Sequence, residues 1–265
     1  MILKFKLGIT LIIIFLFQSC TEHIFEPALY QNDIVYQPKP SSLDIKKSSF
    51  YISGAYGQST TSNISLSTNI GELEISRAHV FKVFNLSYGL YGLIGSEVNG
   101  DSKIDSLVAV NPFIFKSKSF SALGARLSMN LLYTHNRMDF RYLGFEVAYS
   151  HEMGDYLAYR KQVYPLPGYY SSTLNNLVTL GGTTEIVFSP EKSFITQYSF
   201  RLFIGQTFGK FSSLNDPNAI ALPHPDPQIR ISCFLQSRQL FLGLDLKGID
   251  PFSSNAYTVK GGFKF

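Results

Sequence analysis

The sequence predicts an all-β fold: a closed, antiparallel up-and-down barrel of about 12 strands that crosses a membrane. Three observations support this fold: apolar and polar residues alternate with a period of two, the polar face consists mainly of small residues, and the chain ends in a strand-like segment closed by phenylalanine. Hydrophobic residues make up 45% of the 265 residues, whereas only 16% are charged. This composition excludes a disordered chain and suggests that much of the surface faces something other than water.

Several function classes are excluded at this stage. The net charge of +4 is spread along the chain without long basic runs, so no nucleic-acid partner is expected. The two cysteines, Cys20 and Cys233, exclude a disulfide scaffold. The five histidines lack metal-ligand spacing, and we expect neither a metal site nor a cofactor. They are His23, His79, His135, His151 and His224.

The N-terminus predicts export, with residues 1–19 forming a signal peptide. Lys4 and Lys6 precede an apolar run from Leu7 to Phe17, which is short for a membrane-spanning helix. An uncleaved signal anchor is the alternative. The following segment, 20–47, is expected to be an extended tether, because Pro27, Pro38 and Pro40 interrupt any periodic pattern.

The segment Leu16-Phe17-Gln18-Ser19-Cys20 resembles the lipobox of bacterial lipoproteins. The resemblance implies cleavage before Cys20 and attachment of lipid to that residue; an ordinary secretory signal is the alternative. No acidic cluster follows Cys20, so the anchor is expected in a periplasm-facing leaflet.

Residues 48–265 are expected to form the barrel, and the alternation is clearest in the segment Ala122–Tyr133. There Leu123, Leu127 and Leu131 share one face, and Arg126 and Ser128 lie on the other. The expected strands are 48–58, 73–83, 86–97, 105–115, 121–133, 139–150, 155–162, 177–188, 195–208, 228–236, 239–247 and 255–265. An even number returns both ends of the barrel to the periplasm.

The connections are expected to alternate in length, as in outer-membrane barrels. Short turns are predicted near Asn85, Ser117, Gly154, Pro190 and Ser237. Long loops are predicted near Ser62, Gly100, Gly168, Asn215 and Asp250, and the connection at Arg137 is short for an external loop.

A two-residue loop at Ser237-Arg238 predicts the register of one hairpin. In that register Ile231 lies opposite Leu244, and Arg230 lies opposite Asp245 as a cross-strand charge pair.

The small residues of the polar face indicate which side points inward. A water-facing sheet would carry many lysines and glutamates, whereas glycine, alanine, serine and isolated charges suit a crowded lumen. Apolar side chains are therefore expected to face lipid. A soluble periplasmic barrel or sandwich that binds an apolar ligand is the alternative, with the apolar face inward.

The C-terminal segment, residues 257–265, resembles the last strand of bacterial outer-membrane β-barrel proteins. Tyr257, Val259, Phe263 and Phe265 carry the resemblance, with apolar residues at alternate positions before a terminal phenylalanine. It implies recognition by the outer-membrane barrel assembly machinery and a location among outer-membrane lipids.

Isolated charges on the polar face are the candidate functional residues. We expect them either to form a structural ion-pair network or to make a basic constriction that passes a small anionic solute. They are Arg126, Glu146, Arg160, Glu185, Arg201, Arg230, Asp245 and Lys260.

No catalytic residues are predicted. A twelve-stranded phospholipase family is the nearest enzyme class, but the stretch Tyr133–Arg137 around His135 lacks its serine partner and glycine. We therefore expect a non-enzymatic barrel, either a narrow pore or a structural or surface element. An outer-membrane lipid hydrolase is the weaker alternative.

Overall fold

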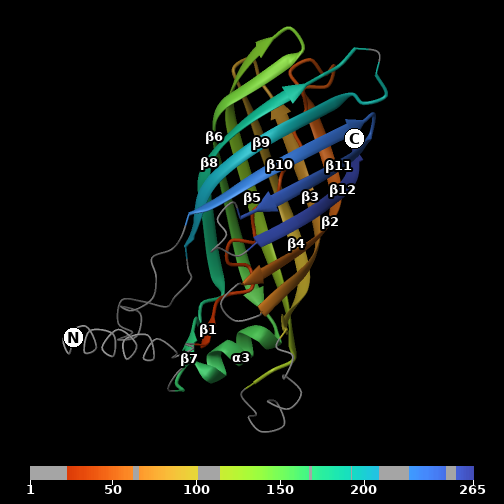
Figure 1. Cartoon of the computed structure of the whole chain (residues 1–265). Coiled ribbons are helices and arrows are strands. Elements are labelled where there is room, and N and C mark those ends of the chain that lie inside the picture. Colours follow the sequence, from red (N-terminus) through yellow and green to blue (C-terminus); the bar gives the residue numbers. More distant parts are fainter. Residues whose placement is uncertain are drawn as a thin grey trace, which may run out of the picture.

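The computed structural model describes residues 23–61, 66–100, 114–166, 169–191, 193–208, 227–248 and 255–265. Ten antiparallel strands form a closed barrel, in which the last strand pairs with the first (Figure 1). The strands are β2 (Ser48–Thr61), β3 (Leu66–Val80), β4 (Phe84–Asn99), β5 (Ser117–His135), β6 (Met138–Met153), β8 (Asn176–Phe188), β9 (Gln197–Phe208), β10 (Gln228–Ser237), β11 (Leu240–Lys247) and β12 (Asn255–Lys264). The predicted all-β closed barrel is confirmed, with ten strands in place of about twelve.

One of the two extra predicted strands is a helix. Residues 155–162 fall in α3 (Asp155–Val163). Its buried positions are Tyr156, Leu157, Tyr159, Arg160 and Val163, and within this set 156, 159 or 160, and 163 follow the three- to four-residue spacing of a helix. The other predicted strand, 105–115, falls mainly on residues outside the described part of the chain.

The two ends of the barrel differ. At the short-turn end the connections are 81–83, 136–137, 189–196 and 238–239, and the chain terminates there. At the long-loop end they are 62–65, 100–116, 154–175, 209–227 and 248–254. The turns predicted near Ser117 and Gly154 belong to the long-loop end, whereas Arg137 lies in a short turn. The predicted strands 105–115 and 155–162 are not among the ten strands of the closed barrel. Every connection between these two segments therefore lies at the opposite end of the barrel from the predicted one.

The β10–β11 hairpin has a different register from the predicted one. Its turn is Arg238-Gln239, with Arg238 at a φ of 52°, the left-handed conformation that tight hairpin turns use. The predicted pairing of Arg230 with Asp245 is therefore wrong. Arg230 lies opposite Lys247, and Asp245 lies opposite Ser232. Since the total shift is two residues, each side chain keeps its predicted face.

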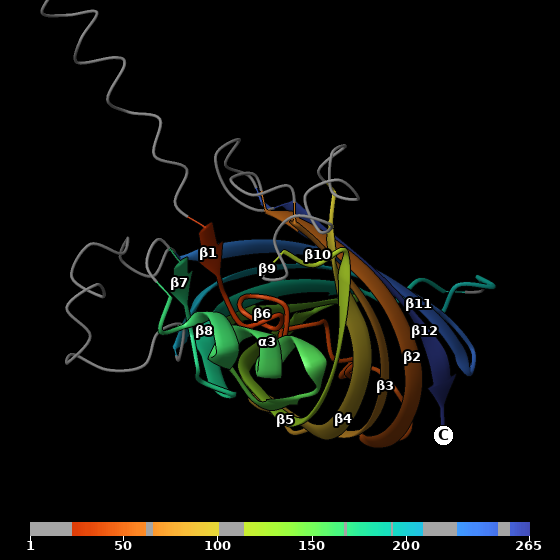
Figure 2. The same ribbon diagram turned by 90° about the horizontal axis from the view of Figure 1, so that it is seen from below.

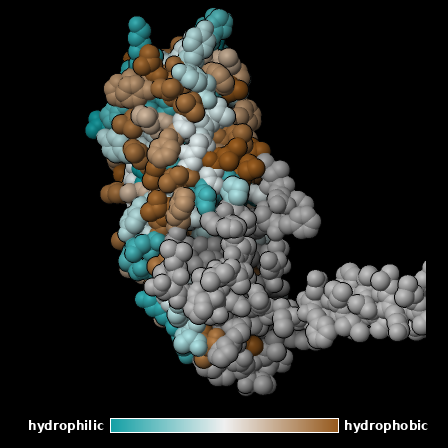
Figure 3. All heavy atoms as spheres, turned by 90° about the vertical axis from the view of Figure 1, so that its left-hand side faces the viewer, coloured by the Kyte–Doolittle hydropathy of each residue, from teal (hydrophilic) through white to brown (hydrophobic). Residues whose placement is uncertain are grey.

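The orientation of the two faces agrees with the prediction. Leu127, Leu202 and Leu244 point outward with 44%, 37% and 37% exposure, whereas Arg126 and Arg201 are buried. Apolar side chains gather over the upper part of the wall in Figure 3. Exposed aromatic residues lie toward the short-turn end, as in the interfacial girdles of membrane barrels. They include Phe50, Phe81, Tyr133, Phe140, Phe263 and Phe265.

The segment expected to be a tether lies inside the barrel. β1 (His23–Phe25) pairs in parallel with β7 (Tyr169–Ser171) beside α3 at the long-loop end. From there residues 25–41 pass through the lumen, and all of them except Glu26 and Asn32 are buried (Figure 2). We call residues 25–41 the plug. A free tether is excluded over this range, because its polar groups bond to the inner wall.

Candidate functional site in the barrel lumen

The plug contacts the wall at successive levels of the lumen. Near the long-loop end the Ala28 N–H donates to a Glu152 carboxylate oxygen over 2.9 Å. Further along, the Thr179 hydroxyl donates to the Asp33 carboxylate over 2.6 Å. At the short-turn end the Ser41 hydroxyl donates to Asp139 over 2.9 Å. These bonds give partners to polar groups of an irregular segment inside the barrel, where they would otherwise be unsatisfied.

One group of charges joins strands β3, β5 and β12, and we call it the Arg126 cluster. The Arg126 guanidinium donates to both Glu72 oxygens, over 2.7 and 2.6 Å, and to Glu74 over 3.0 Å. Lys260 donates to Glu74 and also to the plug carbonyl of Tyr36, the latter over 3.2 Å. Arg126 also donates to the plug carbonyl of Asp33 over 2.8 Å, and the Gln37 side chain of the plug donates to Glu74 over 2.7 Å, so all three strands contact the plug.

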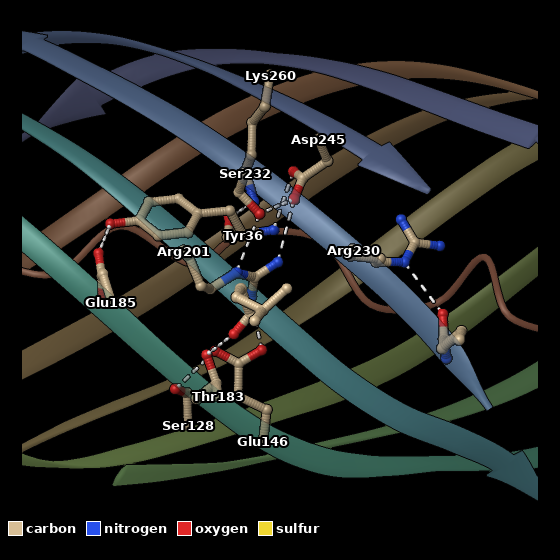
Figure 4. A network of polar contacts seen from close by, with 12 residues as sticks. Tyr36, Ser128, Glu146, Thr183, Glu185, Arg201, Arg230, Ser232, Asp245 and Lys260 are labelled. Carbon is tan, nitrogen blue, oxygen red and sulfur yellow. Dashed lines mark hydrogen bonds and ion pairs between the residues drawn. The ribbon is translucent and has the colours of Figure 1, made fainter. Parts of the chain in front are cut away.

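A second group, the Arg201 cluster, joins strands β6, β9 and β11 (Figure 4). Arg201 on β9 pairs with Glu146 of β6 over 2.6 Å and with Asp245 of β11 over 3.1 Å. Its guanidinium also lies 5.3 Å from the centre of the Tyr36 ring, within cation–π range.

The plug contributes a tyrosine and a lysine next to this cluster. The Tyr36 hydroxyl donates to Glu185 over 2.5 Å and lies 3.0 Å from the Ser199 hydroxyl. The Lys39 ammonium lies 3.6 Å from Glu146 and 3.7 Å from Glu185. Arg141 pairs with the same Glu185 over 2.7 Å. Glu146 and Glu185 therefore each face two cations.

The α3 helix closes the long-loop end over the plug. Arg160 of α3 pairs with Glu152 over 2.6 Å, and Glu152 is the residue that binds the plug at Ala28. Phe25 packs edge-on against Tyr159, with ring centres 5.2 Å apart. In the view from below, α3 lies across the mouth of the ring (Figure 2).

Seven of the eight predicted lumen charges lie buried on the inner faces of strands. They are Arg126, Glu146, Glu185, Arg201, Arg230, Asp245 and Lys260. The eighth, Arg160, is buried too, but it lies on α3 and not on a strand. Arg230 bonds to Gln228 and to the plug carbonyl of Gln31, and not to Asp245 as predicted.

Sequence reasoning missed nine buried charges among the described residues: Asp33, Lys39, Glu72, Glu74, Glu97, Asp139, Arg141, Glu152 and Lys247. Glu72 and Glu74 alternate with Leu73 and Ile75, so period two gave the signal. The predicted strand began at residue 73 and left out Glu72, whereas Glu74 fell inside it and was not singled out.

Arg141 is hidden by an irregularity in β6. A register shift between Arg141 and Gly144 changes the phase of the alternation, which turns Arg141 inward although it is two residues from the outward Leu143. Lys39 belongs to the plug, which has no strand periodicity.

The complete set of buried charges is nearly balanced. The described residues include nine buried acids: Asp33, Glu72, Glu74, Glu97, Asp139, Glu146, Glu152, Glu185 and Asp245. The eight buried bases are Lys39, Arg126, Arg141, Arg160, Arg201, Arg230, Lys247 and Lys260. A basic constriction that passes an anionic solute needs an excess of positive charge in the lumen. Acids from β3, β6 and the plug offset the arginines, so this excess is absent from the described residues.

A small cavity of about 10 Å³ lies between the plug and the wall, lined by residues that include Asn32, Val35, Gln58 and Glu72. Such a volume holds about one water molecule.

Over the described ranges no three His, Cys, Asp or Glu residues are grouped as metal ligands. No helix in those ranges has the length and apolar character of a membrane span.

The outward positions of the predicted assembly signal lie on the last strand. Tyr257, Val259 and Phe263 are exposed on β12, and Phe265 follows it directly. Cys233 lies on the outward face of β10 as a free cysteine. The predicted lipidation site, Cys20, falls outside the described residues.

Comparisons with known proteins return only structures. No protein-family model matches the chain, and no curated protein matches it. An outer-membrane channel from Pseudomonas putida F1 is 10% identical, with a TM-score of 0.46, and the alignment covers 86% of this chain and 100% of the channel.

Two autotransporter domains are also similar. The transport unit of AIDA-I from Escherichia coli is 8% identical with a TM-score of 0.46, covering 89% of this chain and 95% of that one. The β-domain of the Bordetella autotransporter BrkA is 8% identical with a TM-score of 0.41, covering 83% and 99%.

Proposed function

We propose that this chain is an outer-membrane β-barrel lipoprotein whose lumen is permanently filled by its own N-terminal segment. Its role is that of a non-enzymatic scaffold that holds the structures of the long-loop end on a membrane. The observation that carries the proposal is the plug: residues 25–41 occupy the lumen and bond to the wall along its whole length.

The outer surface supports insertion into a bilayer. Leucine, isoleucine and aromatic side chains point outward from all ten strands, including Leu90 at 70% and Leu123 at 62% exposure. A continuous apolar surface of this kind is not maintained in water. The closed strand order also leaves no edge with unpaired backbone groups, which is the condition for β-structure in lipid. Both features argue against the soluble alternative.

The charges of the lumen support a closed state. Removing one partner from a buried ion pair typically costs about 3–5 kcal/mol. Withdrawal of the plug would remove Lys39 from two carboxylates and the Tyr36 hydroxyl from Glu185. A gated pore needs an open state of comparable free energy, whereas here plug and wall share one polar network.

Planar-bilayer recording of the purified protein tests this proposal. We expect no sustained channel from the wild type. In a Cys233→Ser background, Ser41→Cys with Ser189→Cys would tie the plug to the wall, because their hydroxyl oxygens are 2.9 Å apart. Wild-type conductance that disappears in the cross-linked protein would show a gated pore and contradict the proposal.

A second assay addresses the enzymatic alternative. Vesicles of bacterial phospholipid and lipopolysaccharide are incubated with the purified barrel, and released fatty acids are measured. We expect release no greater than with a His135→Ala variant, because His135 was the only residue resembling part of a hydrolase motif. Release that depends on His135 would contradict a purely structural role.

A further inference from the structure

We propose that the mature N-terminus leaves the barrel at the long-loop end, so that lipid on Cys20 anchors the protein from the outer leaflet. This inference rests on the proposed membrane insertion and deepens it by assigning the side of the anchor. It reverses the expectation of a periplasm-facing leaflet that followed from the sequence after Cys20.

The direction of the plug is defined by its contacts. Going toward the N-terminus, Asp44 pairs with Lys264 at the short-turn end over 2.5 Å, and the Ser41 hydroxyl binds Asp139. Tyr36 then binds Glu185, three residues before the short-turn end of β8, and Asp33 binds Thr179, three residues after the start of that strand. Each step toward residue 23 is a step toward the long loops.

The first described residues are fixed at that end. β1 pairs in parallel with β7, with His23 opposite Tyr169 and Phe25 opposite Ser171. β7 belongs to the connection that holds α3, and Arg160 donates to the carbonyl oxygens of Ser172 and Leu174. The exit of the chain is therefore part of a packed structure.

Covalent geometry limits where Cys20 can be. Two residues lie between it and His23, and the three Cα–Cα steps span at most about 11 Å. The hydrocarbon core of a bilayer is about 30 Å thick. A thiol at position 20 therefore cannot reach the leaflet at the short-turn end while β1 remains paired with β7.

Lipid is accessible close to this exit. Val178 and Phe208 are paired near the long-loop ends of β8 and β9, and both are exposed on the outer face. On β5, in contrast, the exposed residues near that end are Ser117 and Ser119. The apolar surface thus extends further on the β8–β9 side than on β5, and the loop that carries β7 enters the wall at β8. Acyl chains attached near β1 can enter the bilayer there.

The long-loop end is the outer face if this barrel follows the general rule for outer-membrane barrels, in which short turns are periplasmic. Phe265 lies at the short-turn end, where it exchanges backbone hydrogen bonds with Phe50. The two termini of the mature chain are then on opposite sides of the membrane.

Site-specific labelling in intact cells tests the inference. In the Cys233→Ser background, single variants His23→Cys, Lys161→Cys and Gln239→Cys are treated with a membrane-impermeant maleimide. Lys161 on α3 marks the long-loop end, and Gln239 marks the short-turn end; both are exposed. We expect His23→Cys and Lys161→Cys to react in intact cells, and Gln239→Cys to react only after permeabilisation.

Each result has a defined meaning. Labelling of His23→Cys only after permeabilisation, together with Gln239→Cys, would overturn the outer location. The Cys233→Ser parent should not react and should incorporate an alkyne fatty acid that Cys20→Ala does not; a reactive parent would overturn the lipid anchor. Extraction of the protein without detergent would instead refute the proposed membrane barrel, which keeps the two failures apart.

Discussion

Arg126 and Glu72 form a two-point ion pair inside the barrel, with both guanidinium Nη atoms within 2.7 Å of the two carboxylate oxygens. The strands that carry them, β5 and β3, are separated in the wall by β4. Side chains therefore connect non-adjacent strands across the inner surface, in addition to the backbone ladder. The predictions below measure how much these connections contribute to stability.

Glu72→Gln should destabilise the barrel by about 3–5 kcal/mol, because it leaves the buried Arg126 charge without its two-point partner. Urea unfolding in phospholipid vesicles measures the change. Glu191→Gln is the matched control, since Glu191 is exposed beside Arg137 and surface pairs contribute at most about 1 kcal/mol. Equal losses in the two variants would mean that Glu72 is hydrated in the native protein.

Asp245 should couple energetically to Arg201 and much less to Arg230. A double-mutant cycle with Arg201→Gln and Asp245→Asn should give an interaction energy above about 1 kcal/mol, as expected for residues in direct contact. The same cycle with Arg230→Gln should be closer to additive, because Arg230 bonds to Gln228 and the plug. Stronger coupling to Arg230 would restore the predicted cross-strand pair and contradict the observed register.

Tyr36→Phe should weaken attachment of the plug without emptying the lumen. The variant keeps the ring contact with Phe234 but loses the hydrogen bond to Glu185, which is worth about 1.5–3 kcal/mol when the acceptor is charged. Limited proteolysis in detergent should then cut the N-terminal segment faster. Tyr56→Phe, on the outer face, should leave the cleavage rate unchanged; a similar increase there would indicate general loosening.

A charge on the outer face should cost more in the apolar belt than beyond it. Leu127→Arg is expected to destabilise the inserted barrel by about 2–4 kcal/mol, as near a bilayer midplane, and Ser119→Arg by about 0–1 kcal/mol. Both parent residues are exposed on β5. Folding into vesicles of defined lipid, followed by urea titration, measures the difference. Equal costs would place the two positions at the same depth.

Period-two alternation was sufficient for most of the wall. It placed Arg126 and Ser128 inward and Leu127 outward, because successive residues of a strand point to opposite faces. It also found ten of the strands and seven of the strand-borne charges. The shift at Arg141 escaped it, because a bulge changes the phase without any mark in the local composition.

The plug could not be recognised from local sequence. Pro27, Pro38 and Pro40 have no backbone donor and do not alternate, so the segment has the composition of an exposed linker. Its burial depends on bonds to residues far away in the chain, such as Thr179 and Glu185. Information of that kind is not contained in a window of neighbouring residues. Residues 155–163 have the three- and four-residue spacing of a helix, but this segment of nine residues is too short for its pattern to stand out from the period-two alternation of the neighbouring strands.

Because the barrel closes around the plug, its last strand constrains the order of folding steps. β12 pairs with β2 and so closes the barrel. The same strand contacts the plug, because Lys260 donates to the Tyr36 carbonyl, and its Lys264 pairs with Asp44 just after the plug. If β2 and β12 paired early, residues 23–41 and any acyl chains on Cys20 would have to thread through the lumen of a closed barrel. Closure of the sheet around the segment avoids this threading step. The plug would then act as the template around which the barrel closes.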